Sequence, residues 1–247
     1  MVEFSRSCVS KKMCNFQFEV VRDYQIFSVF YQIFTKLNLN KFNSYLYIYM
    51  AVYKNIIERD TTDVDQCDFY WFKSGFSNED IDKINTFANN YEYRDGEVFN
   101  GVNDGSVRKT KLKWLPSTED SSWLYTKMFE LANMANNACY KFRLHYALDD
   151  MQYTLYEGNS NGKYDWHIDI GSGSNSLRKL SAVLLLTDPS EFTGGELQIF
   201  TSSSPRTIPL EKGSIVFFPS FLLHRVTPVT SGERKTLVFW MGGDHFQ

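Results

Sequence analysis

The sequence predicts a mainly β fold with flanking helices, a double-stranded β-helix (jelly roll) supported by helices on its N-terminal side. Two observations lead to this fold. From Met151 onward, about eight short apolar segments alternate with turns rich in Gly, Ser and Pro, a pattern typical of double-sheet antiparallel architectures. Before them, two segments carry apolar residues at helical spacing. We therefore expect these helices to cover an outer face of a sheet.

The N-terminal residues 1–49 differ in composition from the rest of the chain. They contain no Gly or Pro and are rich in Phe, Tyr, Asn, Ile and Lys. An accessory helical hairpin, an amphipathic segment lying on a surface and an upstream extension of the reading frame all fit this stretch. We expect a compact domain to begin near Met50 and to span 50–247, with helical support in 68–150 and the jelly roll in 151–243, and we expect residues 1–49 to be dispensable for it.

The elements before the jelly roll follow from local signals. Residues 69–72 are apolar and aromatic and are expected to form a strand. Ser77, followed by acidic residues, predicts a helix N-terminus. The segment 95–105 is rich in Gly, Asn and Asp and is expected to be a loop, and 109–115 is expected to be extended. A second helix is expected over 117–138.

The strands expected in the jelly roll are separated by Gly, Pro or Ser at most of the breaks. Their ranges are 151–157, 164–169, 179–187, 196–200, 206–210, 214–218, 223–228 and 235–241. Residues 180–186 are mostly apolar instead of alternating between apolar and polar. This pattern predicts a strand that is covered on both faces.

The composition disfavours some function classes. The chain has 247 residues and a formal charge of −3, which argues against an extended nucleic-acid interface because such interfaces usually need a basic face. No apolar run is long enough to predict a membrane span. The four cysteines are scattered and include no Cys-x-x-Cys pair. We therefore expect no disulfide framework and a reducing, cytoplasmic setting.

The main functional signal lies in the strand expected at 164–169, which reads Tyr-Asp-Trp-His-Ile-Asp. Side chains at positions i and i+2 of a strand point to the same face, so His167 and Asp169 are expected to project together. An imidazole and a carboxylate supply two-thirds of a two-His-one-carboxylate site, which suits Fe(II). By itself the spacing also fits a chance pair in a strand.

Two downstream features strengthen the metal hypothesis. His224 lies in a late strand, and a jelly roll that folds back on itself can bring it beside His167, although a surface or packed core histidine is the alternative for His224 alone. Arg234 and Thr236 share one face of the next strand. A guanidinium that faces an apolar interior needs an anionic partner. A bound dicarboxylic acid, with one end on the metal and the other on Arg234, would supply it.

Together these motifs resemble the Fe(II)- and 2-oxoglutarate-dependent dioxygenases, and within them the prolyl-hydroxylase-like branch that includes the PKHD-type hydroxylases. The similarity covers approximately residues 68–243 and leaves 1–49 outside. It depends on the His-x-Asp motif, the distal His224 and an arginine ten positions later. Further matching text lies in 153–156, 180–188, 194–197 and 217–220.

The resemblance implies roles for six residues. Three would be iron ligands: His167, Asp169 and His224. Arg234 would bind the distal carboxylate of 2-oxoglutarate, and Thr236 would assist it. Tyr156 would line the 2-oxoglutarate pocket, although a packed strand aromatic fits it equally. The branch often carries a second tyrosine on the strand that here reads Val-Leu-Leu at 183–185.

The implied reaction is hydroxylation of an unactivated C–H bond, with release of succinate and CO2. It would need Fe(II), 2-oxoglutarate and O2, with ascorbate as reductant. The substrate would be a peptidyl residue or a small molecule, selected by the loops at 95–105 and 158–163. Two other classes stay open on the residues alone: a cupin-like metal enzyme that does not use 2-oxoglutarate, and a metal-free jelly-roll module that binds carbohydrate or protein.

Overall fold

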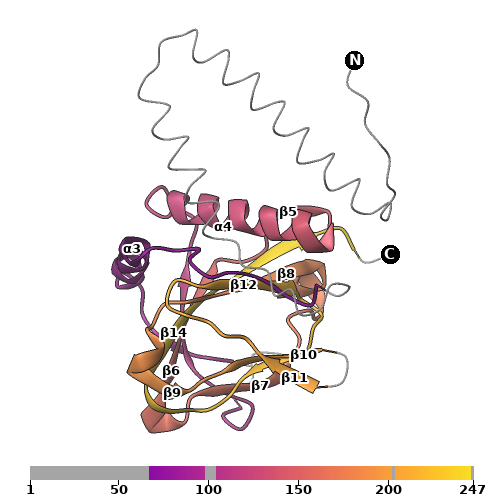
Figure 1. Cartoon of the computed structure of the whole chain (residues 1–247). Coiled ribbons are helices and arrows are strands. Elements are labelled where there is room, and N and C mark those ends of the chain that lie inside the picture. Colours follow the sequence, from indigo (N-terminus) through magenta and orange to yellow (C-terminus); the bar gives the residue numbers. More distant parts are fainter. Residues whose placement is uncertain (1–66, 98–103, 202–203, 246–247) are drawn as a thin grey trace, which may run out of the picture. The chain divides into compact units, whose positions relative to one another are not determined.

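A computed structural model of the chain describes residues 67–97, 104–201 and 204–245. The expected extension 1–49 and the expected domain start near Met50 lie outside these residues. Within the described part, the strands form two antiparallel sheets, and two α-helices precede most of them in the chain (Figure 1). The fold is therefore mainly β with supporting helices, as the sequence predicted.

The larger sheet is organised around the long strand β14 (Val229–Gly243), which pairs with β8 (Arg178–Leu185) on one side and β6 (Met151–Glu157) on the other. Beyond β8 lie β12 (Ile215–Pro219) and β1 (Tyr70–Phe72), and beyond β6 lie β4 (Lys111–Leu115) and β2 (Arg94–Asp95). Two short strands pair with the ends of β14: β5 (Leu144–Ala147) and β9 (Phe192–Gly194).

The smaller sheet lies across from the larger one (Figure 1). Its strand order is β11 (Ser204–Thr207), β10 (Leu197–Thr201), β13 (His224–Val226), β7 (Lys163–His167) and β3 (Arg108–Lys109). Because β13 and β7 are neighbours although 57 positions separate their two histidines, this sheet brings distant parts of the sequence together.

Successive side chains along the strands of the larger sheet point to opposite faces, and each face packs in its own hydrophobic core. On β12, Ile215 and Phe217 pack in the core beneath the helices, while Val216 and Phe218 pack in the core between the sheets. Strand β8 divides in the same way, with Leu184 on the helical side and Val183 between the sheets. Both faces of these strands are thus buried, which explains the continuous apolar run at 180–186.

Two helices cover the outer face of the larger sheet. The first, α3 (Asn78–Ala88), has Ser77 as its N-cap, which forms a capping box with Asp80, as the sequence predicted. The second, α4 (Ser122–Ala135), lies along the sheet in Figure 1 and continues into one π turn, η2 (Asn136–Tyr140). None of the helices among the described residues is long and apolar enough to cross a membrane.

The helix expected over 117–138 was wrong at its N-terminal end. The Ser121 hydroxyl donates to the carbonyl of Pro116 and accepts the N–H of Thr118, at 2.7 and 2.8 Å. These bonds close a turn in the segment after Pro116 and so delay the start of α4 until Ser122. Short 3-10 turns occupy three loops of the jelly roll: η3 (Gly158–Ser160), η4 (Gly173–Leu177) and η5 (Pro189–Glu191).

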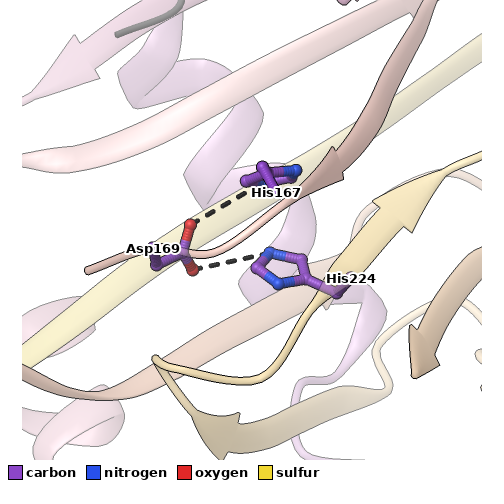
Figure 2. Close-up of side chains that lie close together, drawn as sticks. All are labelled: His167, Asp169 and His224. Carbon is purple, nitrogen blue, oxygen red and sulfur yellow. Dashed lines mark ion pairs between the residues drawn. The ribbon is translucent and has the colours of Figure 1, made fainter. Parts of the chain in front are cut away.

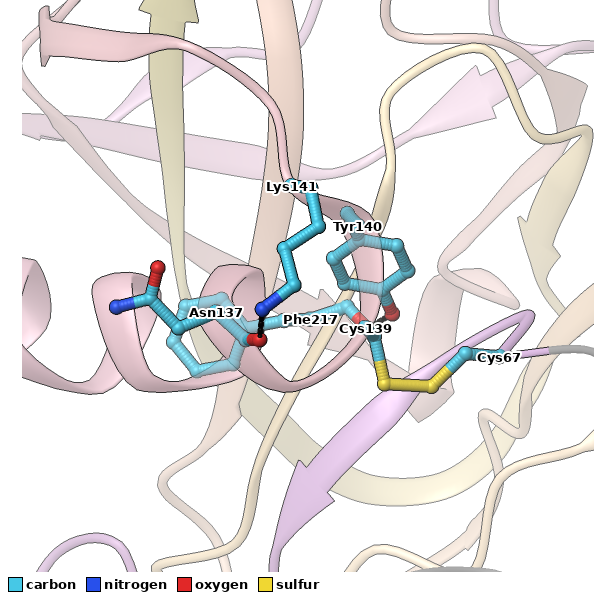
Figure 3. Close-up of a disulfide and its surroundings, with 6 residues drawn as sticks. All are labelled: Cys67, Asn137, Cys139, Tyr140, Lys141 and Phe217. Atoms are coloured by element: carbon cyan, nitrogen blue, oxygen red, sulfur yellow. Dashed lines mark hydrogen bonds between the residues drawn. A yellow bond between two sulfur atoms is a disulfide. The ribbon is translucent and has the colours of Figure 1, made fainter. Parts of the chain in front are cut away.

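A disulfide between Cys67 and Cys139 joins the segment before β1 to η2 (Figure 3). The expectation that the cysteines form no disulfide was therefore wrong for this pair. The two residues are 72 positions apart, and only the fold brings them together, because β1 joins the sheet edge beside the end of the helical layer. In the same region, the Tyr140 hydroxyl donates to the carbonyl of Phe217 at 2.9 Å and ties η2 to β12.

Candidate active site

The centre of the site is a pair of histidines on neighbouring strands. His167 ends β7 and His224 begins β13, and the two residues are directly paired in the ladder. Their ring centroids are 4.2 Å apart. The sequence expectation that the strand extends to Asp169 was wrong by two residues, because β13 begins at His224 and offers no ladder partner beyond it. The Asp169 N–H instead donates to the carbonyl of Ser220 at 2.9 Å.

The carboxylate of Asp169 faces both imidazoles (Figure 2). Its Oδ1 lies 3.7 Å from Nε2 of His167, and its Oδ2 lies 3.6 Å from Nε2 of His224. All three potential ligand atoms lie within 4.8 Å of one another. With metal–ligand bonds of about 2 Å, this spacing fits three adjacent positions around a single ion and leaves the opposite positions open.

Hydrogen bonds orient both imidazoles for metal binding. The Nδ1 of His167 lies 2.7 Å from the carbonyl of Asp165, and the Nδ1 of His224 lies 2.9 Å from the carbonyl of Leu222. A carbonyl can only accept, so each Nδ1 carries a proton, and in the neutral imidazole each Nε2 keeps its lone pair for a metal. Aromatic contacts fix the same rings: Tyr164 stacks on His167 at 3.5 Å, and Phe218 packs edge-on against His224 at 4.7 Å.

The electrostatics favour the protonation states that a metal needs. Burial, and then the nearby His224, lower the pKa of His167 to about 3. Burial alone would raise the pKa of Asp169, but His224, His167 and the Ser181 hydroxyl together hold it below the ordinary value of 3.8. The site therefore presents a neutral imidazole beside an ionised carboxylate at neutral pH.

A buried cationic pocket lies beside this centre. Arg234 and Thr236 point from β14 into the same cavity as the two histidines, and both are almost fully buried, with exposures of 2% and 1%. Nη1 of Arg234 has no hydrogen-bond partner in the described part of the chain. The Arg234 guanidinium lies 5.2 Å from the ring of Tyr156, which also lines the cavity. Burial raises the pKa of Tyr156, so its hydroxyl stays protonated.

Gly195 also contributes to this pocket, because it leaves space beside Arg234. A Cβ at Gly195 would lie 2.7 Å from Cδ of Arg234. The absence of a side chain therefore leaves the space that the buried arginine occupies, in addition to allowing the positive φ of 65°.

These residues share one cavity of about 610 Å³. The structure brings together all six residues proposed from the sequence. They come from β6 and β14 of the larger sheet, from β7 and β13 of the smaller sheet, and from the segment after β7. It also adds polar residues that sequence reasoning missed, chiefly Arg108, Gln152 and Arg178. For Gln152 a signal was available, because it lies four positions before Tyr156 on the same face of β6.

The chain is similar to known proteins over the region that contains this site. The model of the 2OG-Fe(II) oxygenase superfamily matches residues 151–242. A PKHD-type hydroxylase of Teredinibacter turnerae is 32% identical over 161 residues, which cover 53% of this chain and 71% of the relative. A PKHD-type hydroxylase of Synechococcus sp. is 30% identical over 166 residues, which cover 64% of this chain and 70% of the relative.

Solved structures share the fold at low sequence identity. The crystal structure of a Pseudomonas putida prolyl-4-hydroxylase superposes with a TM-score of 0.58 and 19% identity, covering 72% of this chain and 93% of the other. A Trichoplax adhaerens prolyl hydroxylase, in complex with a peptide fragment of the hypoxia inducible factor oxygen degradation domain, gives a TM-score of 0.61 at 16% identity, covering 73% and 86%.

Proposed function

Because the chain belongs to the PKHD-type hydroxylases of the 2OG-Fe(II) oxygenase superfamily, we propose that it hydroxylates an unactivated C–H bond of a peptidyl residue and releases succinate and CO2 from 2-oxoglutarate. The observation that supports this most directly is one cavity that is lined both by three side chains able to bind a single metal ion and by a buried arginine whose Nη1 has no partner among the described residues.

His167, Asp169 and His224 would hold Fe(II). Their chemistry fits, because both Nε2 atoms carry lone pairs and the carboxylate is ionised. Bound Fe(II), 2-oxoglutarate and O2 supply the oxidising chemistry of this superfamily. The contribution of the chain is to hold the three ligand atoms in place and to leave adjacent positions accessible from the cavity.

Arg234 would bind the distal carboxylate of 2-oxoglutarate. A fully buried guanidinium is costly unless an anion neutralises it, and its fork of N–H groups matches a carboxylate. Thr236 shares its face of β14, and the protonated hydroxyl of Tyr156 can donate to the same co-substrate. Val183 and Val238 line the cavity nearby and exclude water from the reacting end.

The peptidyl substrate is supported by the names of the structural neighbours, several of which are prolyl hydroxylases. A cupin-like enzyme without 2-oxoglutarate would have no use for Arg234, and a metal-free binding module would have no use for the ligand cluster. We also propose ascorbate as the reductant that keeps the iron in its Fe(II) state.

Binding measurements test the proposal without knowledge of the substrate. Purified protein under argon should bind one Fe(II), and 2-oxoglutarate should bind to the Fe(II) form. His167→Ala and Asp169→Ala should lose iron, whereas Arg234→Ala should keep iron and lose 2-oxoglutarate. In air, ascorbate should sustain slow succinate release by the wild-type protein.

Arg94→Gln is the control, since it removes a positive charge from the exposed strand β2 at a residue that does not line the cavity. Loss of iron together with unchanged 2-oxoglutarate affinity in Arg234→Ala would contradict the assignment of roles.

We further propose a cytoplasmic setting, in which the Cys67–Cys139 disulfide of the structure would be reduced to thiols. Rapid alkylation of cells with a mass-tagged maleimide would find both cysteines labelled. A protein that is found fully disulfide-bonded in cells would exclude this location.

A further inference from the structure

The cavity contains a second buried guanidinium besides that of Arg234. Arg108, on β3, lines the cavity and is 7% exposed. Its three hydrogen bonds all go to uncharged oxygens: Oγ1 of Thr110, the carbonyl of Glu97 and Oε1 of Gln152, at 2.9, 3.0 and 3.3 Å. Among the described residues, no carboxylate forms an ion pair with it.

Arg178 provides an internal comparison, because it lines the same cavity but its charge is already neutralised. Its guanidinium pairs with the carboxylate of Asp149 through both Nε and Nη2. It also lies over the ring of Trp240 at 4.0 Å and donates to the carbonyl of Asp169 at 3.2 Å. Arg108 and Arg178 thus differ in one respect that matters for binding, which is whether a counter-ion is already present.

Arg108 is held rigidly in its position. Bonds from three of its nitrogens fix the plane of the guanidinium, and Gln152 is itself fixed by donating to Oγ1 of Thr154 at 3.0 Å. A Cβ at Gly96 would lie 2.8 Å from Nε of Arg108 and 2.2 Å from Oγ1 of Thr110. Gly96 therefore leaves the space for this arrangement, which makes the arginine pre-organised for a ligand.

Two N–H groups of Arg108 are left over. A guanidinium has five N–H groups, and three are used by the bonds to Thr110, Glu97 and Gln152. The remaining two, on Nη1 and Nη2, have no partner among the residues that the structure describes. One N–H on each terminal nitrogen is therefore available to an anion, and a carboxylate is the anion that a guanidinium matches best.

Arg108 lies near the proposed iron ligands without contacting them in the described part of the chain. Its guanidinium is 4.5 Å from the ring of Tyr164, and the other neighbour of that ring is the imidazole of His167, at 3.5 Å. One aromatic ring therefore separates the arginine from a proposed iron ligand. Arg108 comes from the smaller sheet, next to β7, whereas Arg234 comes from β14 of the larger sheet. The two guanidinia therefore reach the cavity from different sheets, and both lie near Tyr156.

We infer that Arg108 binds a carboxylate of the substrate, so that this enzyme selects a peptide with an Asp or Glu side chain near the residue that it hydroxylates. The inference depends on the proposed function. It extends that function by naming the substrate class as acidic peptides, and it explains why a buried positive charge is kept in the cavity without a counter-ion of its own.

The test measures binding and not turnover. The wild-type enzyme, loaded with Fe(II) and 2-oxoglutarate under argon, selects peptides from a random nine-residue library, and the bound peptides are sequenced. We expect enrichment of Asp and Glu at one position relative to the rest of the peptide. Synthetic pairs that differ only as Asp/Asn or Glu/Gln at that position should differ in affinity by about tenfold or more.

Variants assign the preference to Arg108. In Arg108→Gln the acidic and amide peptides should bind equally, while Fe(II) and 2-oxoglutarate still bind. Arg108→Lys should keep part of the preference, because it restores the charge without the fork. Gly96→Ala should displace the guanidinium without changing its charge, and should therefore also weaken the preference for acidic peptides. Arg178→Gln is the matched control from the same cavity, and should retain the preference because Asp149 already occupies that arginine.

A parallel binding experiment with N-acetyl-aspartate, N-acetyl-glutamate and free amino acids shows whether the bound carboxylate belongs to a peptide or to a small molecule. Binding that depends on Arg108 in this arm alone would assign the site to small carboxylic acids and overturn the peptide class. Absence of any such binding in both arms, or an acidic preference that survives in Arg108→Gln, would overturn the inference as a whole. Failure of the wild-type enzyme to bind iron or 2-oxoglutarate would instead refute the proposed function.

Discussion

The hydroxyl of Ser181 donates a hydrogen bond of 2.7 Å to Oδ2 of Asp169, which links β8 of the larger sheet to the segment after β7 of the smaller one. The Oγ of Ser220 lies 2.9 Å from the same hydroxyl, and the carbonyl of Ser220 accepts the N–H of Asp169. Both serines are fully buried. The carboxylate is therefore positioned by contacts with residues far away in the sequence.

Replacing Ser181 should weaken metal binding without abolishing it. In Ser181→Ala the carboxylate loses the donor that orients it, and contacts of this kind typically contribute a factor of about 10 to 100 in metal affinity. Competition between the protein and a chelator for Co(II) measures the effect. Ser122→Ala, at the exposed start of α4, is the control. Equal metal affinity in Ser181→Ala and the wild type would mean that Asp169 is oriented by its backbone alone.

Arg234→Met should change stability and binding in opposite directions. Methionine fills a similar volume without a charge, so the variant removes a buried guanidinium that has an unpartnered Nη1 among the described residues. Replacing buried charges by apolar groups of similar size often stabilises a fold by about 1 to 4 kcal/mol. Thermal melts of the metal-loaded protein without co-substrate should therefore show a higher Tm for Arg234→Met.

The same variant should lose its response to 2-oxoglutarate. A ligand at 100 times its dissociation constant stabilises the folded state by about 2.7 kcal/mol, and this gain should appear in the wild type and be absent in Arg234→Met. A lower Tm for the variant without 2-oxoglutarate would show that the guanidinium contributes to the fold through contacts of its own.

The parts of the fold that depend on local pattern could be predicted from the sequence. Strand β6 has the bounds expected for it, and α3 begins after its expected N-cap, Ser77, because alternation and capping act over a few residues. The end of β7 was misplaced by two residues, since it is decided by where β13 begins to pair with it. Strands β5 and β9 were missed because they exist only as partners of the ends of β14.

The residues of the candidate site also fall into those that a local pattern predicts and those that only contacts between distant segments reveal. The motifs that carry the six proposed residues are readable because each is defined by spacing within one strand or by its similarity to a family. Ser181 and Arg108 gave no such signal. Their partners, Asp169 and Gln152, are 12 and 44 positions away in the sequence, so only the register between strands assigns them to the cavity. The Cys67–Cys139 pair was missed for the same reason.

Asp80→Asn should destabilise the helical layer in a way that depends on pH. Oδ2 of Asp80 accepts the backbone N–H of Ser77 at 2.9 Å and the ammonium of Lys127 at 2.8 Å, and so connects α3 to α4. Burial alone would raise the pKa of Asp80, but Lys127 and Ser77 together hold it below the ordinary value of 3.8. Because the folded-state pKa is the lower one, the carboxylate contributes its stability above pH 3.8 and loses it as the pH falls through the folded value.

At pH 7 the variant should therefore be less stable by about 1 to 2 kcal/mol, and the difference from the wild type should shrink below pH 3.8. Urea unfolding between pH 7 and pH 3, followed by circular dichroism, measures both. Asp82→Asn changes an exposed carboxylate of the same helix and should have little effect. A difference that stays constant over the whole pH range would show that the lost contacts do not involve the charge of Asp80.

Cys139→Ser should lower the stability of the oxidised protein substantially. The disulfide closes a loop over 72 positions, and the loss of chain entropy in the unfolded state predicts a contribution of about 4 kcal/mol for a loop of this length. Cys67→Ser and the double variant should give the same loss, because each removes the same single bond. Dithiothreitol should lower the Tm of the wild type to that of Cys139→Ser and leave the variants unchanged. If reduction left the wild-type Tm unaltered, β1 and η2 would be held together by packing and by the Tyr140–Phe217 hydrogen bond instead.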